Sequence, residues 1–209
     1  MLKRKIMESK EDREVRIQKW LKRPHSWSSH SQFTMYSKED WYNKYIMGGE
    51  SKPSKEMLFG SKVDRQIQDD PTFIPDLIRE TELQYRMECK LNKFNLVGIP
   101  DAICLTKKRL RDYKTGKGEW THSRAHGTGQ LTWYLLQVYL IHKINPEEFE
   151  CYIDWLPTID TVDGDIAFRD DPVKPFTFKT KRTLREVLDF GNKIIKTREE
   201  MVRFARNHS

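Results

Sequence analysis

Residues 98–116 read GIPDAICLTKKRLRDYKTG, two strand-like runs separated by a short basic turn at 106–108. We expect strands over 94–105 and 109–114, because alternating apolar residues on both sides of a connection this short are typical of an antiparallel hairpin. The sequence therefore predicts a hairpin at the centre of the fold.

Three side chains of this hairpin are expected to converge. With the turn centred near residue 107, Asp101 lies opposite Asp112 or one place from it. Side chains alternate across a strand, so Asp112 and Lys114 project from the same face. Pro100 cannot donate to a sheet ladder, and the irregularity expected there would turn Asp101 toward that face.

Two carboxylates and a lysine in one patch indicate a particular chemistry. Adjacent carboxylates repel each other, and burying them is costly unless a cation neutralises them. Hard oxygen ligands suit Mg²⁺ or Mn²⁺. A lysine beside such a metal can position a water molecule and offset the negative charge that develops at phosphorus. The pattern predicts metal-dependent hydrolysis of a phosphodiester.

The motifs also carry a family resemblance. Asp101, the run Asp112-Tyr113-Lys114 and a later Q-x-x-x-Y formed by Gln130 and Tyr134 follow one another in the order of a known motif set. This pattern resembles the PD-(D/E)XK nucleases, and specifically their RecB-like and phage-type exonuclease branch, over residues 31–155. The resemblance implies that Asp101, Asp112, Lys114, Gln130 and Tyr134 are catalytic residues. It also implies that Asp101 and Asp112, together with the carbonyl of Tyr113, bind the metal.

Further metal ligands are implied only by the resemblance. The run 59–64, FGSKVD, is similar to the family's F-G-x-x-x-H, with Asp64 at the histidine position, where it is either an oxygen ligand or a helix-surface acid. An acid on the preceding strand often completes the metal sphere in the family. Glu82 is the first candidate and Glu80 the second, with a solvated face as the alternative for either. Four cysteines for an iron-sulfur cluster are not present, since the chain has three.

A contact surface for substrate is expected after the hairpin. The glycine-rich basic stretch 115–127, TGKGEWTHSRAHG, is interpreted as a loop that touches phosphates, with a plain flexible loop as the alternative. Its candidate nucleic-acid-binding residues are Thr115, Lys117, Arg124 and His126. Gln130 and Tyr134, one helical turn apart, share a face that either borders this site or is a polar pair in the core.

Composition is consistent with a nucleic-acid partner. The chain has 209 residues, a formal net charge of +7 and a pI near 9.2, and such a balance favours polyanions through counterion release. We expect no membrane span and no secretory signal, and therefore an intracellular, cytoplasmic protein. The cysteines Cys89, Cys104 and Cys151 each fall in an expected strand and are interpreted as small buried hydrophobes.

The expected fold is α/β, with a three-layer core like that of restriction endonucleases and a mixed sheet of about four strands flanked by helices. One domain, 1–209, would comprise a helical extension (about 1–30), the core (about 31–156) and a C-terminal hairpin and helix (about 157–209). Strands are also expected over 80–91 and 149–156. Residues 25–34 are expected to form a loop with exposed His25 and His30, and 55–68 a helix with Met57 and Leu58 in its core stripe.

The functional hypothesis is a deoxyribonuclease that uses Mg²⁺ or Mn²⁺. The resemblance implies an exonuclease that processes linear or single-stranded DNA ends in recombination or repair, with protein partners in such a complex and a phage gene as one origin. Two alternatives stay open. One is an inactive nuclease fold that serves as a nucleic-acid-binding subunit, and the other is a structure-specific endonuclease.

Overall fold

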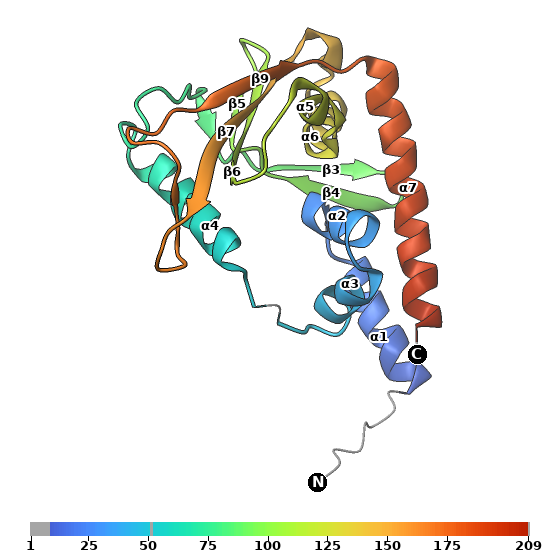
Figure 1. Ribbon diagram of the computed structural model, residues 1–209. Helices are drawn as coiled ribbons and strands as arrows, with labels where there is room; N and C mark the ends of the chain where they lie inside the picture. Colours follow the sequence, from blue (N-terminus) through green and yellow to red (C-terminus); the bar gives the residue numbers. More distant parts are fainter. Residues whose placement is uncertain (1–8, 51, 209) are drawn as a thin grey trace. The chain divides into compact units, whose positions relative to one another are not determined.

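The computed structural model describes residues 9–50 and 52–208 (Figure 1). Contacts between residues divide the chain into two compact units. Of the described residues, unit 1 comprises 9–50, 88–97 and 189–208, and unit 2 comprises 52–87 and 98–188. The chain therefore crosses between the units several times, and folding as one domain stays a prediction. No helix within the described residues is both long and apolar enough to cross a membrane.

Unit 1 is mostly helical, with α1 (Lys10–Leu21), α2 (Trp27–Met35), α3 (Lys38–Tyr45) and the larger part of α7 (Leu184–Asn207). Serine side chains begin the first three helices by accepting a backbone N–H, as N-cap residues do. The predicted loop at 25–34 is wrong, because Ser26 caps α2 through the N–H of Ser29 at 3.3 Å. The predicted final helix is confirmed.

Aromatic rings fill the core of unit 1. Trp41 contacts Trp20 and Phe33 edge to face, with ring centroids 5.2 and 5.0 Å apart, a preferred arrangement for aromatic pairs. A small sheet in the order β1 (His25–Ser26), β4 (Phe94–Gly98), β3 (Met87–Leu91) completes the unit. The core of this unit thus depends on aromatic rings that α1, α2 and α3 each contribute.

The two histidines at the start of unit 1 are buried, which corrects the prediction that they are exposed. His25 is 1% and His30 5% exposed. His30 lies among rings, with centroids 5.6 Å from His25, 5.9 Å from Trp27 and 6.1 Å from Phe190. Burial lowers the pKa of His30 to about 4. Unit 1 therefore disfavours protonation of this ring.

We predict that His30 makes the stability of the protein fall at acid pH. Its folded pKa is lower than the unfolded value of 6.5, so the unfolded chain binds more protons between about pH 4 and 6.5. The contribution of His30 to the free energy of unfolding is fully present above pH 6.5. It is lost, by about 3 kcal/mol, as the pH falls toward 4. His30→Phe should flatten this decrease in urea titrations at pH 7, 5.5 and 4.

His122, whose side chain is exposed, provides the control. His122→Phe should keep the slope of the wild type. Equal slopes in the wild type and in His30→Phe would contradict the burial of His30.

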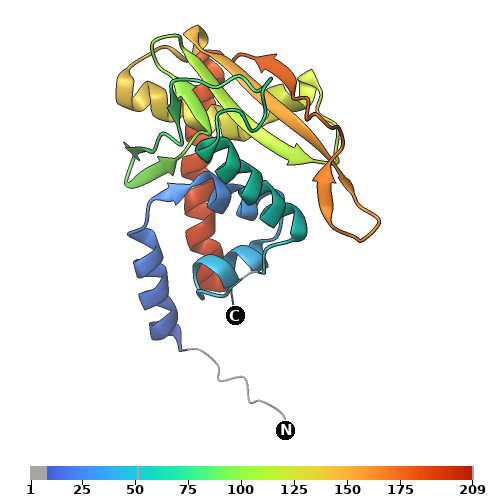
Figure 2. The same ribbon diagram turned by 90° about the vertical axis from the view of Figure 1, so that its left-hand side faces the viewer.

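Unit 2 contains a mixed sheet in the order β2 (Glu82–Leu83), β5 (Ala102–Cys104), β6 (Arg109–Gly116), β7 (Glu150–Asp160), β8 (Ile166–Phe168), with β9 (Phe176–Thr180) also paired to β7. The long strands β6 and β7 are parallel, from Arg109 opposite Glu150 to Gly116 opposite Pro157, and run side by side in Figure 2. The predicted fold class is confirmed, with six strands rather than about four.

Two predicted continuous strands are each broken. Residues 94–105 divide into β4 and β5 on either side of Pro100, and residues 80–91 divide into β2 and β3. The pieces next to the turn at 92–93, β3 and β4, join the small sheet of unit 1. The outer pieces, β2 and β5, pair with each other in unit 2. Proline ends β4 because it lacks the N–H that a ladder needs. The break leaves Asp101 at the very start of β5.

Helices cover both faces of the sheet in unit 2. From α4 (Lys55–Asp69), Val63 and Ile67 pack in an apolar cluster with Leu156 and Tyr113. From α6 (Gly129–His142), Gln130 contacts Lys114. Tyr113 and Lys114 are neighbours on β6 and point to opposite faces, so the two helices flank the sheet (Figure 1).

The helices approach the sheet closely at two glycines. A Cβ at Gly60 would lie 3.0 Å from Thr115 Oγ1, and one at Gly98 would lie 2.1 Å from Gln137 Oε1, an atom of a fully buried side chain. Met57 and Leu58 are 58% and 57% exposed, so their predicted place in the core stripe of α4 is wrong. Of the cysteines, Cys104 and Cys151 are buried as predicted and Cys89 is half-buried.

Candidate active site

The hairpin places the two strand aspartates on one face, as predicted. In the β5–β6 ladder Ala102 lies opposite Arg111 and Ile103 opposite Leu110. The next pair along is Asp101 and Asp112, and residues opposite each other in an antiparallel ladder share a face. Asp112 is completely buried. Two carboxylates therefore lie side by side at the start of β5.

Asp101 is held by its neighbours rather than by the ladder. Its Oδ2 accepts the backbone N–H of Tyr113 at 2.7 Å, next to the point where Pro100 interrupts the strand. Burial, and then the charge of Asp112, raise the pKa of Asp101 to about 8. The pair thus resists carrying two negative charges without a cation.

Lys114 supplies one positive charge to this pair. Its Nζ lies 2.6 Å from Asp112 Oδ2 and donates to Gln130 Oε1 at 3.0 Å. Burial alone would lower the pKa of Lys114, but Asp112 and Asp101 outweigh it and the pKa is raised. The amine is therefore charged at neutral pH and fixed between a carboxylate and an amide oxygen.

A chain of hydrogen bonds from α6 holds the side-chain amide of Gln130 in place. Gln130 Nε2 donates to Tyr134 Oη at 2.8 Å, and Tyr134 Oη donates to the carbonyl oxygen of Ile99 at 3.0 Å. Burial raises the pKa of Tyr134, so the phenol keeps its proton. Of the two readings of this pair, the geometry supports the one at the site, since the relay leads from the strand break to Lys114.

Gln84 is a site residue that the sequence analysis missed. Its Nε2 donates to Asp64 Oδ1 at 3.1 Å and lies 3.4 Å from Asp101 Oδ1, while its backbone N–H donates to the Asp101 carbonyl oxygen at 3.0 Å. Its φ of +50° lies in the left-handed region, uncommon for a residue other than glycine. The predicted continuous strand hid this turn, and only the register of β2 against β5 reveals it.

Asp64 reaches the site from α4 through Gln84. Burial raises the pKa of Asp64, and the charge of Asp112 acts in the same direction. Asp64 is half-buried and also accepts from Gln68 of its own helix at 3.0 Å. Its role as a metal ligand stays a prediction.

The strand acids have different places. Glu82 lies opposite Ile103, two cross-strand pairs from the position of Asp101, and as a ligand it stays a prediction. Glu80 is wrong as a candidate, because its Oε1 accepts from Arg111 Nε at 2.9 Å. Arg111 neighbours Asp112 in the strand and points to the opposite face. The carboxylate of Glu80 is thus turned away from Asp112.

The residues proposed to touch nucleic acid are dispersed. Thr115 lies on the face opposite Lys114, against Gly60. Lys117 Nζ is 2.5 Å from Asp160 Oδ1 and 3.8 Å from Glu56 Oε1. The four proposed contact residues do not form a single basic patch in the described part of the chain.

The other two lie on or beside α5 (His122–Gly127), which replaces part of the predicted loop. Arg124 donates to the carbonyl oxygens of Gly118 and Glu119 and stacks 4.3 Å from the Trp120 ring centroid. His126 Nδ1 lies 3.0 Å from Thr180 Oγ1. Arg124 is exposed and prearranged beside an aromatic ring, whereas His126 is tied to β9.

The donor set suits a hard cation without forming a complete cage. Among residues 9–50 and 52–208, no three His, Cys, Asp or Glu side chains gather as a ready metal site. Neither buried oxygen of Asp112 has a hydrogen-bond partner of regular geometry in that same part of the chain. Carboxylate oxygens left open beside a second, destabilised carboxylate fit Mg²⁺ or Mn²⁺.

Tyr113 donates its backbone N–H to Asp101 and its hydroxyl to the Ile78 carbonyl oxygen. Its own carbonyl stays a predicted ligand.

Comparison with solved structures identifies the fold. A predicted exonuclease from Eubacterium rectale matches with a TM-score of 0.60 at 14% identity, over 99% of this chain and 87% of that one. A phage-related exonuclease from Haemophilus somnus (TM-score 0.47, 13% identity, 79% and 78% coverage) and an alkaline exonuclease from Laribacter hongkongensis (0.40, 11%, 92% and 96%) also match. No protein-family model and no curated protein matches the sequence. At 14% identity, the first match establishes a shared fold.

A buried ion-pair network lies on the face of β6 opposite Asp112. Arg111 pairs with Glu80 and, at 2.9 Å, with Asp154 Oδ2, and all three side chains are at most 3% exposed. Arg111→Met would leave two buried carboxylates without a cation. We predict a loss of about 3–5 kcal/mol in the free energy of unfolding, measured by denaturant titration at pH 7.

Arg109→Met is the matched control. It lies two residues away on the same strand, is 40% exposed and has only a long contact of 3.9 Å to Glu150. Removing an exposed pair of this kind costs at most about 1 kcal/mol. Similar losses for the two variants would contradict the role assigned to the buried network.

Proposed function

We propose that the chain is a divalent-metal-dependent deoxyribonuclease of the PD-(D/E)XK type, in its RecB-like or phage-type exonuclease branch. One observation carries the proposal. Asp101, Asp112 and Lys114 share one face of the β5–β6 hairpin, with the Lys114 ammonium 2.6 Å from a buried carboxylate oxygen. Two carboxylates to hold a metal and an ammonium to offset charge at phosphorus are what phosphodiester hydrolysis requires.

The carboxylates of Asp101 and Asp112 would hold Mg²⁺ or Mn²⁺, with Asp64, Glu82 and the Tyr113 carbonyl as further candidate ligands. The buried Oδ1 of Asp112, which has no hydrogen-bond partner among the described residues, and the raised pKa of Asp101 support this assignment. Such a cation supplies activation of water and polarisation of a phosphoryl oxygen. The resulting loss of repulsion between the two acids also favours binding.

Lys114, Gln130 and Tyr134 act as a unit. The ammonium of Lys114 would donate to the attacking water and to the phosphoryl oxygens as negative charge grows in the transition state. Gln130 holds that ammonium by its Oε1, and Tyr134 holds Gln130. A side chain prearranged in this way loses less free energy to reorientation during the reaction.

DNA is the proposed substrate, with linear or single-stranded ends preferred. The net charge of +7 supports attraction to a polyanion, and exposed Arg124 stacked beside Trp120 suits contact with a phosphate or an unpaired base. Lys117, Thr115 and His126 remain proposed contacts with less support. Attack at DNA ends, and a place in recombination or repair, rest on the family resemblance.

We predict that the purified protein degrades linear DNA in Mg²⁺ or Mn²⁺ and not in a chelator. Asp112→Asn and Lys114→Met should each lower the rate about 100-fold or more, because each removes a charge that acts in the transition state. Exposed Asp163 and Lys196 give the controls Asp163→Asn and Lys196→Met, which should retain the wild-type rate.

Three results separate the alternatives. Cutting of closed circular DNA as fast as linear DNA would favour an endonuclease. Binding of DNA by the wild type without cleavage would favour an inactive binding subunit, an alternative supported by the neutral Gln84 beside Asp101. Cleavage that Asp112→Asn and Lys114→Met leave unchanged would refute the proposed site.

A further inference from the structure

Unit 1 contains a pocket of about 310 Å³ that the nuclease proposal does not use. Its walls are mostly apolar or aromatic, and one buried cation forms part of its lining. The residues that line it come from α1, the β3–β4 turn and α7, and those that carry the argument are Lys93, Phe94, Ile195, Arg198, Glu199 and Val202. Pockets that take small molecules begin at about this size.

The buried cation is Arg198, which is only 4% exposed. Its Nη1 lies 3.4 Å from His25 Nδ1, and its Nε and Nη2 have no hydrogen-bond partner within the described residues. The guanidinium carbon lies 3.5 Å from the Trp20 ring centroid and 5.6 Å from that of Phe94. Rings stabilise a cation but do not neutralise it.

A buried charge without a counterion is costly, and buried guanidinium groups are ordinarily paired with a carboxylate or a phosphate. No ion pair of Arg198 is formed among residues 9–50 and 52–208, although Glu199 lines the same pocket. Burial lowers the pKa of Arg198 to about 10, so the group is still charged at neutral pH. The pocket therefore has a buried positive charge without a counterion.

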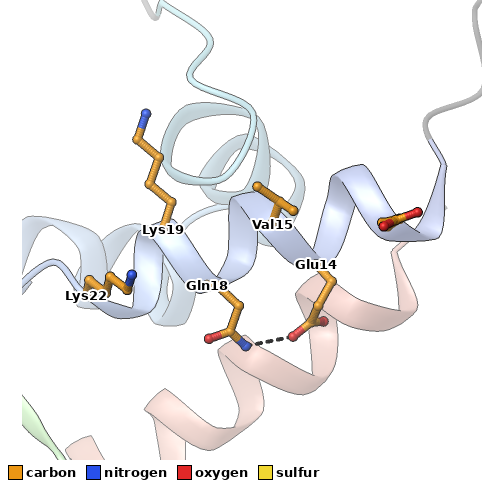
Figure 3. Close-up of a pocket in the computed structure, with 6 residues that line it drawn as sticks. Glu14, Val15, Gln18, Lys19 and Lys22 are labelled. Carbon is orange, nitrogen blue, oxygen red and sulfur yellow. Dashed lines mark hydrogen bonds between the residues drawn. The ribbon is translucent and has the colours of Figure 1, made fainter.

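The hollow on the outer face of α1 shows the contrast. Figure 3 shows Glu14, Gln18 and Lys19 projecting from this helix, with Gln18 bonded to Glu14, and Glu14 also pairs with Arg206 at 2.9 Å. Acids and bases line that hollow together, and Glu14 is held by both Gln18 and Arg206. The charges of Glu11, Lys19 and Lys22 are of both signs and lie on exposed side chains, whereas the cation of the Arg198 pocket is buried.

We propose that the Arg198 pocket binds a small organic anion, with a phosphate or carboxylate head on Arg198 and an apolar or flat body against Phe94, Ile195 and Val202. Lys93, exposed on the β3–β4 turn, adds a second positive charge at the rim. Two cations outweigh the single acid Glu199. The proposal does not depend on the nuclease function.

Phenyl phosphate is the probe that tests this site, because it joins a doubly acidic head to a flat ring. Titrated in a chelating buffer and followed by calorimetry and by methyl NMR, it should bind with a Kd of about 1 mM. The methyl signals of Ile195 and Val202 should shift most. Inorganic phosphate or phenol alone should bind at least about 10-fold more weakly, since each lacks one half of the recognised group.

Substitutions then locate the anion. Arg198→Met should weaken binding about 10-fold or more, the usual effect of losing charge-assisted hydrogen bonds, and Lys93→Met about 2- to 5-fold. Lys196→Met, an exposed residue of the same helix, makes the same change in net charge and should bind like the wild type. Lys93→Met alters only an exposed turn, so it keeps the test open if Arg198→Met does not fold.

Two outcomes would overturn the proposal. The first is phenyl phosphate that causes no shift of the Ile195 and Val202 methyls at 10-fold above the expected Kd. The second is binding that Lys93→Met and Arg198→Met weaken no more than Lys196→Met does, which would indicate general attraction to a basic protein.

Discussion

The repulsion between the completely buried carboxylate of Asp112 and the half-buried carboxylate of Asp101 is the constraint on which this structure depends. Asp112 is completely buried beside Asp101, whose pKa rises to about 8 through burial and through the charge of its neighbour. Lys114 supplies one positive charge, which offsets one of the two acids, so ionising the second acid calls for a further cation. A native fold retains such an arrangement against its cost when the site has a use for the charge.

The rest of unit 2 keeps that arrangement in place. Pro100 ends β4 and frees Asp101 to accept the Tyr113 N–H, and the hydroxyl of Tyr134 returns to the strand break at the Ile99 carbonyl. Gln84 adds a neutral donor beside Asp101, two residues after Glu82, the first acid that the family resemblance offers as a ligand. An amide there orients Asp101 without adding to the repulsion, and this lowers the negative charge available to a cation.

Much of the site could be predicted because its geometry is local. Asp112 and Lys114 share a face by strand alternation alone, and that prediction is confirmed. Gln84 could not be found, because its turn depends on which strand pairs with β5, and the local sequence has no glycine or proline to mark it. Glu80 failed for a related reason, since Arg111 behind the sheet binds it. His30 was misjudged because its burial depends on packing against Phe190, a residue far along the chain.

Diffraction from crystals grown with Mn²⁺, recorded at the manganese absorption edge, tests the central claim most directly. We predict an anomalous peak within about 2.0–2.4 Å of a carboxylate oxygen of both Asp101 and Asp112, which disappears in Asp112→Asn crystals. A map with both carboxylates ordered, saturating Mn²⁺ and no peak between them would contradict the claim that this pair exists to hold a cation.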